Sequence, residues 1–148
     1  MKGFTMIYEF PLTVETAHLV GSPVEEEVKL THGVVHRVEV EFPAGCVGLV
    51  HVAIDHFAHQ AWPANPSGSF ASDDYVVAFD DYLPLLTPPY KLKLRGWTEG
   101  TSYDHTVKVR IGLLPESIAK KRFGTLSEAD SKRMRQTLLS ELTGVEGL

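Results

Sequence analysis

Three histidines that lie close together in the sequence are the first candidates for chemistry. His51, His56 and His59 flank Asp55, and imidazole and carboxylate groups are common ligands of zinc. His51 and His59 are separated by an even number of residues, which would place them on one face of a continuous strand. A turn expected near Asp55 breaks the register between them. The sequence has neither a His-x-His pair nor a His-Glu-x-x-His motif. A metal-dependent enzyme that uses His51, His56 and His59 is therefore our third hypothesis, and we predict a protein with no cofactor.

Other residue types typical of catalysis do not form a known motif. Acidic pairs occur at Asp73-Asp74 and Asp80-Asp81, but general acid–base catalysis needs two carboxyl groups in one cleft, and both pairs fall at expected strand ends. The sequence contains no nucleophile elbow, phosphate-binding loop or dinucleotide-binding fingerprint. The single cysteine, Cys46, excludes an internal disulfide and is typical of a small buried residue. We predict no catalytic residues and no enzyme activity.

Aromatic residues favour a binding role as the second hypothesis. Sugar-binding β-sandwiches stack their ligands on exposed aromatic rings, and Trp62, Tyr90 and Trp97 are candidates for such a platform. The competing interpretation places these side chains in the core, because each ring can bury on the order of 150–250 Å². A carbohydrate- or ligand-binding module built on Trp62, Tyr90 and Trp97 is thus the alternative to a purely structural protein.

The elements that must position these residues are mostly strands. Apolar and polar residues alternate with period two from Val34 to Phe42, which predicts a half-buried strand. We expect its buried face to hold Val34, His36, Val38, Val40 and Phe42. Alternation or short apolar runs also predict strands over residues 4–10, 27–31, 47–54, 56–62, 74–79, 90–97 and 103–114, the last two as a hairpin.

This spacing of strands and turns indicates the fold class. It predicts an all-β domain over residues 1–114, an antiparallel sandwich of jelly-roll type with about seven or eight strands. Lys91, Lys93, Arg95, Lys108 and Arg110 would form a basic stripe on one sheet face, balanced by Glu39 and Glu41 if those strands are neighbours.

Residues 115–148 form a different region, which we predict to be a helical tail. Residues 115–124 have proline in the first turn and glycine at the end of a short helix. A second helix follows an N-cap signal at Ser127. A helix of about four turns is marginal alone in water, so it must dock on its own sandwich or on a neighbouring subunit. The candidate oligomer contact is its apolar stripe of Met134, Leu138, Leu139 and Leu142.

Charge and hydropathy restrict the partners. The formal net charge of −5 gives no electrostatic reason to expect nucleic acid or an anionic membrane as partner. No apolar run of about 18 residues occurs, and the first ten residues are too polar for a signal peptide. We therefore expect no transmembrane segment, and a location in the cytoplasm or in a virion assembled there.

Five short segments between Val38 and Pro115 are similar to segments of known proteins: residues 41–46, 48–53, 60–70, 88–93 and 113–115. Through them, the stretch from Val38 to Pro115 resembles a group of small β-sandwich proteins encoded near the virion genes of tailed phages. The resemblance covers about half of the chain and contains no catalytic motif. It implies a virion component, either capsid-decorating or tail-associated.

The leading hypothesis is therefore a non-enzymatic structural or assembly protein. We expect it to form a homo-oligomer or to coat a larger particle through protein–protein contacts. A glycan partner belongs to the second hypothesis.

Overall fold

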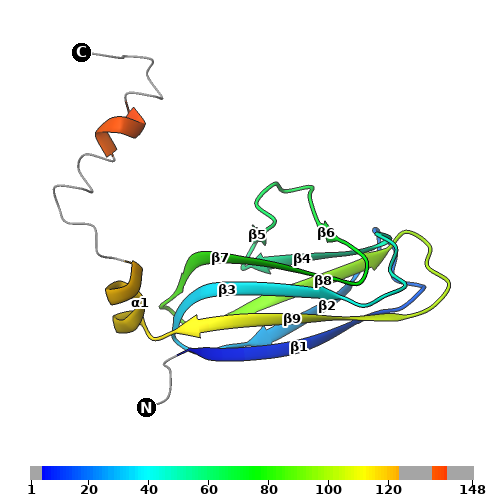
Figure 1. The fold of residues 1–148 in the computed structure, drawn as a ribbon, viewed down its shortest axis with the longest axis horizontal. Coiled ribbons are helices and arrows are strands. Elements are labelled where there is room, and N and C mark those ends of the chain that lie inside the picture. Colours follow the sequence, from blue (N-terminus) through cyan, green and yellow to red (C-terminus); the bar gives the residue numbers. More distant parts are fainter. Residues whose placement is uncertain (1–4, 124–134, 140–148) are drawn as a thin grey trace. The chain divides into compact units, whose positions relative to one another are not determined.

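The computed structural model describes residues 5–123 and 135–139. The chain divides into two compact units, Met1–Glu116 and Ser117–Leu148. The described part of the first unit is all-β, and Figure 1 labels its strands in chain order. They are β1 (Met6–Val14), β2 (Val24–Lys29), β3 (Gly33–Phe42), β4 (Val50–His56), β5 (His59–Trp62), β6 (Phe70–Ala71), β7 (Tyr75–Leu85), β8 (Lys91–Thr98) and β9 (His105–Leu114).

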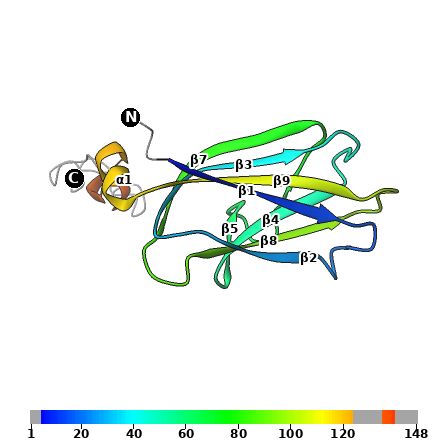
Figure 2. The same ribbon diagram turned by 90° about the horizontal axis from the view of Figure 1, so that it is seen from below.

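The strands form two antiparallel sheets, which Figure 2 shows as two layers. The four-stranded sheet has the order β1-β9-β3-β7. The five-stranded sheet has the order β2-β8-β4-β5, with the two-residue β6 paired to β4. An all-β sandwich, as the alternation predicts, is confirmed.

Strand pairing is nested along the chain. β1 pairs with β9, β2 with β8, β3 with β7 and β4 with β5. Two further pairings, of β9 with β3 and of β8 with β4, complete the sheets. Successive strands from β1 to β4 therefore alternate between the two sheets, so each connection crosses from one layer to the other.

Period-two alternation builds the core between the layers. In β8, Leu92, Leu94 and Gly96 are buried, while the residues between them face water. A side chain at Gly96 would place its Cβ 2.7 Å from Val14, so only glycine allows the two sheets to approach so closely there. The largest fully buried side chains are Phe42, Leu12, Ile54, Leu92, Leu94, Ile111, Leu113 and Leu114.

A β-bulge in β3 corrects the expected burial pattern. The register with both β7 and β9 shifts between Val35 and Arg37. Against β9, His36 is the extra residue, whereas against β7 it lies opposite two residues, Asp81 and Tyr82. A bulge reverses the facing of every residue that precedes it. Val35 therefore joins Val38 in the core cluster, and the prediction that Val34 and His36 share that face is wrong.

The expected hairpin of residues 90–97 and 103–114 is also wrong. β8 lies in the five-stranded sheet and β9 in the four-stranded sheet, so the turn between them joins the two layers. The strand expected from Val47 begins only at Val50, because Val47 and Gly48 have positive φ angles of 51° and 72°. Prolines occur within β1 and β7, which are both edge strands and need no donor on their outer side.

The second unit is described only in part. Helix α1 (Glu116–Phe123) begins at the last residue of the first unit and continues into the second. Residues 135–139 are also helical. Leu138 and Leu139 are 55% and 59% exposed, whereas Met134 and Leu142 lie outside the described residues. Among the described helices, none has the length and apolar character to cross a membrane.

Candidate functional site

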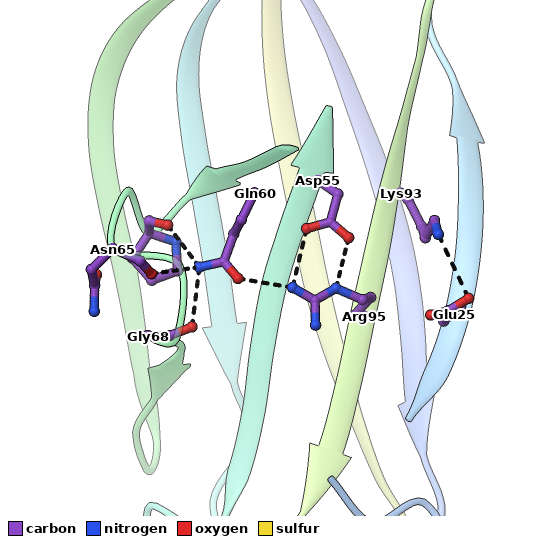
Figure 3. A network of polar contacts seen from close by, with 8 residues as sticks. Glu25, Asp55, Gln60, Asn65, Gly68, Lys93 and Arg95 are labelled. Carbon is purple, nitrogen blue, oxygen red and sulfur yellow. Dashed lines mark hydrogen bonds and ion pairs between the residues drawn. The ribbon is translucent and has the colours of Figure 1, made fainter. Parts of the chain in front are cut away.

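A row of polar contacts crosses the outer face of the five-stranded sheet (Figure 3). The Arg95 guanidinium donates to both carboxylate oxygens of Asp55, at 2.6 and 3.1 Å, and to Gln60 Oε1 at 2.8 Å. The Arg95 and Asp55 side chains are only 24% and 13% exposed, and such bidentate, part-buried pairs are stronger than ordinary surface ion pairs. This row joins β8 to β4 and β5.

Gln60 links that row to the loop between β5 and β6. Its amide nitrogen donates to the carbonyl oxygens of Pro63, Asn65 and Gly68 at 2.8, 3.0 and 3.1 Å. Because the amide has two hydrogens, the three carbonyls share them. Gln60 therefore links the β5–β6 loop to the sheet, and Figure 3 shows its contacts with Asn65 and Gly68.

Next to Arg95, the ring of Trp97 stacks against the ring of His51. The His51 and Trp97 rings are parallel within 4° at 5.5 Å, and Arg95 lies 5.9 Å from the Trp97 ring. His51 Nδ1 lies 2.8 Å from Ser69 Oγ, and Nε2 lies 3.0 Å from Glu99 Oε1.

This Ser69–His51–Glu99 chain has the residue types of a catalytic triad with the nitrogens exchanged. In serine hydrolases Nε2 faces the nucleophile and Nδ1 faces the acid. Here His51 Nδ1 contacts the β5–β6 loop through Ser69, whereas Nε2 lies close to Glu99 of the β8–β9 turn without forming a hydrogen bond.

The outer face of the four-stranded sheet is a second charge network. Arg110 contacts Glu9 at 2.9 Å, Glu41 at 2.7 Å and Glu39 at 3.4 Å. The hydrogen bond from Arg110 lowers the pKa of Glu41, and the carboxylates raise the pKa of Arg110. Arg37 pairs in the same way with Asp80 at 3.0 Å.

The predicted single basic stripe is therefore wrong. Its five members lie on two different sheets. The predicted balance of Arg110 by Glu39 and Glu41 is confirmed. Lys91 and Lys93 face acidic partners on β2, at Glu27 and Glu25.

A pocket of about 260 Å³ lies at the end of the sandwich where the β3–β4 and β8–β9 loops meet. Val47 and Tyr103 at its lining are 69% and 78% exposed. His105 also lines the pocket, and its Nδ1 atom is buried without a hydrogen-bond partner among the described residues. The lining residues are Gly45, Val47, Leu49, Gly100, Thr101, Ser102, Tyr103 and His105.

Asp73 shapes this pocket from outside. Its carboxylate accepts the backbone N–H groups of Val47 and Gly45, both at 2.9 Å, and these bonds lower its pKa. The turn so formed holds Val47 at a positive φ, which a β-branched residue rarely adopts. Burial raises the pKa of the Cys46 thiol in the same turn, which disfavours the reactive thiolate.

The predicted aromatic platform does not form one surface. Trp62 is 5% exposed, and its indole N–H donates to Asp81 at 2.6 Å. Tyr90 packs against the core cluster and makes an edge contact with His32. Trp97 alone of the three lies on the outer face of a sheet, half-buried beside His51.

The predicted histidine cluster is dispersed as well. His51 is engaged by Ser69 and Glu99, while His56 and His59 face each other across the β4–β5 turn. Burial, followed by the neighbouring His59, lowers the pKa of His56. Within residues 5–123 and 135–139, no group of three or more His, Cys, Asp or Glu side chains is arranged to hold a metal ion.

A last feature is the apolar rim along β7. Tyr75 is 61% exposed, Val76 38%, Tyr82 42% and Leu86, just past the strand, 39%. β7 is an edge strand, as Figure 1 shows. Exposed apolar side chains on an edge strand are candidates for contact with another molecule.

Sequence reasoning missed both the loop pocket and the rim. Gly45 and Gly48 around Val47 were a sequence signal for a turn, but His105 and Asp73 are too distant in sequence to be connected with it. The sequence predicts β7 as a strand but not as an edge strand, because a strand lies at the edge of a sheet only through its pairing with other strands.

Comparison with known proteins adds little to this geometry. No family model matches the chain, and no curated protein matches it. A chain from a solved structure described as "Bacillus endospore appendages form a novel family of disulfide-linked pili" is 7% identical. The match covers 77% of this chain and 93% of that one, with a TM-score of 0.34. A likeness at this level supports no functional assignment.

Proposed function

We propose that this chain is a non-enzymatic structural protein that assembles with further copies of itself through protein–protein contacts. The observation that carries the proposal is the apolar rim formed by Tyr75, Val76, Tyr82 and Leu86 on one edge strand and just beyond it. Burying such side chains contributes about 25 cal/mol for each Å² removed from water. The 55% exposed Leu138 in the helical residues 135–139 offers a second apolar contact of the same kind.

The proposal includes a jelly-roll classification of the sandwich. The nested pairs β1·β9, β2·β8, β3·β7 and β4·β5 are those of one long hairpin wrapped into two layers. Jelly rolls occur in viral capsid proteins, lectins and cupins, so this class is compatible with assembly and with ligand binding. A particle surface is the setting implied by the resemblance of Val38–Pro115 to phage-encoded proteins.

Light scattering on the purified full-length chain tests the assembly role. We expect a mass that is a multiple of 16.4 kDa and that falls on dilution. A mass of one chain at every attainable concentration would contradict the proposal. For the particle setting, we expect the protein to sediment with particles purified from the producing cells.

Ligand binding at the loop pocket is the second candidate function. It is favoured by the exposed Tyr103 ring beside hydroxyl-bearing Thr101 and Ser102 in the lining of the pocket. An aromatic face with nearby polar groups suits a sugar ring. A glycan array should then show binding that Tyr103→Ala abolishes and Trp97→Ala leaves unchanged. The absence of any binding would eliminate this function.

A further inference from the structure

We propose that His56 and His59 form a two-imidazole binding site for a divalent transition-metal ion at the β4–β5 turn. The two histidines are the protein ligands, and water completes the coordination of the ion. The site goes beyond the proposed assembly function and does not depend on it. It also differs from the predicted three-histidine centre, because His51 contacts Ser69 and stacks on Trp97 instead.

The first argument is the register of the hairpin. His56 and His59 are direct partners in the antiparallel pairing of β4 with β5, and only the turn at residues 57–58 separates them. Directly opposite side chains point to the same face of a sheet, with Cβ atoms about 4.5–5.5 Å apart. Two nitrogens that share one zinc-sized ion lie roughly 3–3.5 Å apart, because each Zn–N bond is about 2.0–2.1 Å long. Imidazole rings on such neighbouring Cβ atoms can reach that separation.

The second argument is that the hairpin is already formed. Phe57 has a φ of 55°, and a positive φ at the first turn position is typical of tight two-residue hairpins. Its ring lies against the His56 ring, with centroids 4.5 Å apart. The next residue pair along the strands, Asp55 with Gln60, is bound to Arg95, as Figure 3 shows. Both strands that carry the histidines are therefore held in place, so metal binding orders few additional groups.

The third argument is that both rings are available to a ligand. Within residues 5–123 and 135–139, no hydrogen bond or ion pair engages the imidazole of His56 or His59. His59 is exposed and His56 is half-buried, so an ion can reach the pair from solution. The neighbouring Asp55–Arg95 pair has no net charge, so it does not repel a cation.

The ligand set selects the class of ion. Imidazole nitrogen suits Zn²⁺, Ni²⁺ and Cu²⁺, whereas Mg²⁺ and Ca²⁺ require oxygen ligands. The affinity of a nitrogen site rises from Ni²⁺ to Cu²⁺ and falls again at Zn²⁺, so we expect Cu²⁺ to bind most tightly. Structural zinc sites have four protein ligands and catalytic ones have three. A site with two leaves the other positions to exchangeable ligands, so the ion binds reversibly and the fold does not depend on it.

A histidine far from the pair provides the matched control. The carbonyl oxygen of His18 accepts the N–H of Thr98, at the end of β8, at 2.7 Å. Asp55, one residue before the pair, lies opposite Lys93 near the start of the same strand. His18 and the β4–β5 turn therefore lie at opposite ends of the five-stranded sheet. In the part of the chain that the structure describes, no third His, Cys, Asp or Glu side chain extends the pair into a larger cluster.

Calorimetric titration of Cu²⁺ into the untagged full-length chain tests the site, at a slightly alkaline pH because imidazoles bind metals in their neutral form. His56→Gln and His59→Gln should each weaken binding roughly tenfold or more, since losing a ligand costs at least as much as losing its supporting contacts. His18→Gln should leave the affinity unchanged. Circular dichroism checks folding, and the exposed His59 can be replaced without loss of packing. In NMR spectra, paramagnetic Cu²⁺ should broaden the ring protons of His56 and His59 before those of His18.

Four results would overturn the site. They are the absence of Cu²⁺ binding, binding that His59→Gln leaves unchanged, an equal loss with His18→Gln, and Mg²⁺ binding as tight as that of Cu²⁺. The third result would mean that single histidines bind the ion independently, and the fourth that oxygen ligands hold it. None of them changes the mass of the chain in solution, so the assembly proposal is tested separately.

Discussion

Arg95 and Asp55 face each other across β8 and β4, joined by two hydrogen bonds of 2.6 and 3.1 Å. A third bond, from Arg95 to Gln60 Oε1, extends the contact to β5. Three strands of one sheet are thus joined on their outer face by a single guanidinium.

Replacing Arg95 by lysine should destabilise the protein by about 1–2 kcal/mol, because an ammonium group cannot reproduce the planar two-bond contact and also reach Gln60. Urea unfolding followed by circular dichroism measures the change. The control is Lys93→Met on the same face of β8, whose partner Glu25 is 3.7 Å away and exposed. That change should cost no more than about 0.5 kcal/mol. Equal losses in both variants would argue against a special role for Arg95.

Changing Gln60 to glutamate keeps the shape of the side chain but removes its donors. Three carbonyl oxygens of residues 63–68 would then face an acceptor, and we expect a loss of about 1–3 kcal/mol. Hydrogen exchange should rise within residues 63–69, and proteases should cut there first. Ala64→Glu adds the same charge to the loop without removing the amide, so it should leave exchange near the wild-type rate.

Trp62→Phe should destabilise the fold by about 1–3 kcal/mol, because it leaves a cavity and removes the donor to Asp81. Trp97→Phe should cost less, since Trp97 lies half-buried on the outer face. Thermal unfolding of the two variants measures the difference. The reverse order of stability would contradict the placement of Trp62 in the core.

Val47→Asn should stabilise the protein by about 1 kcal/mol. Valine is strained at its φ of 51°, which asparagine tolerates, and the 69% exposed side chain contributes little burial. The control Val20→Asn changes a similarly exposed valine that does not have a positive φ, and it should have almost no effect. Chemical unfolding at neutral pH compares them. A loss of stability in Val47→Asn would show that the turn is not strained.

Asp73 should make the β3–β4 turn sensitive to acid. Because its pKa is lowered in the folded state, its stabilising effect is present above the unfolded pKa and is lost as the pH falls through the folded pKa. Asp73→Asn should therefore be less stable than the wild type at neutral pH, with the difference vanishing in strong acid. Unfolding curves over a pH series test this, with Asp74→Asn as the neighbouring control. A constant difference at all pH values would contradict the role of the Asp73 charge.

The all-β class and most strands could be predicted from the sequence, because burial on one face of a strand leaves a period of two. The β3 strand shows the limit of that rule. Its alternation continues unbroken through His36, yet the bulge there reverses the facing of the residues before it. A bulge depends on two partner strands, β7 and β9, which the local sequence does not contain.

The pairing of strands was beyond the sequence for a related reason. Residues 90–97 and 103–114 have the spacing of a hairpin, but the turn between them crosses from one sheet to the other. The same long-range pairing decides which aromatic rings face water. Trp62 and Trp97 both lie in segments that the sequence predicts as strands. Only the packing of the two sheets places Trp62 in the core and Trp97 on the outer face.

Nested pairing also determines the order in which this domain can fold during synthesis. Among the described strands, β9 is the only one that pairs with β1, and Met6 lies opposite Leu113, which is almost at the other end of the domain sequence. Such a high contact order makes folding slow. During synthesis β1 therefore stays without its partner until β9 has followed it. A nascent chain that stalls before β9 exposes β1 and β3 together, and this is the moment when a chaperone is most needed.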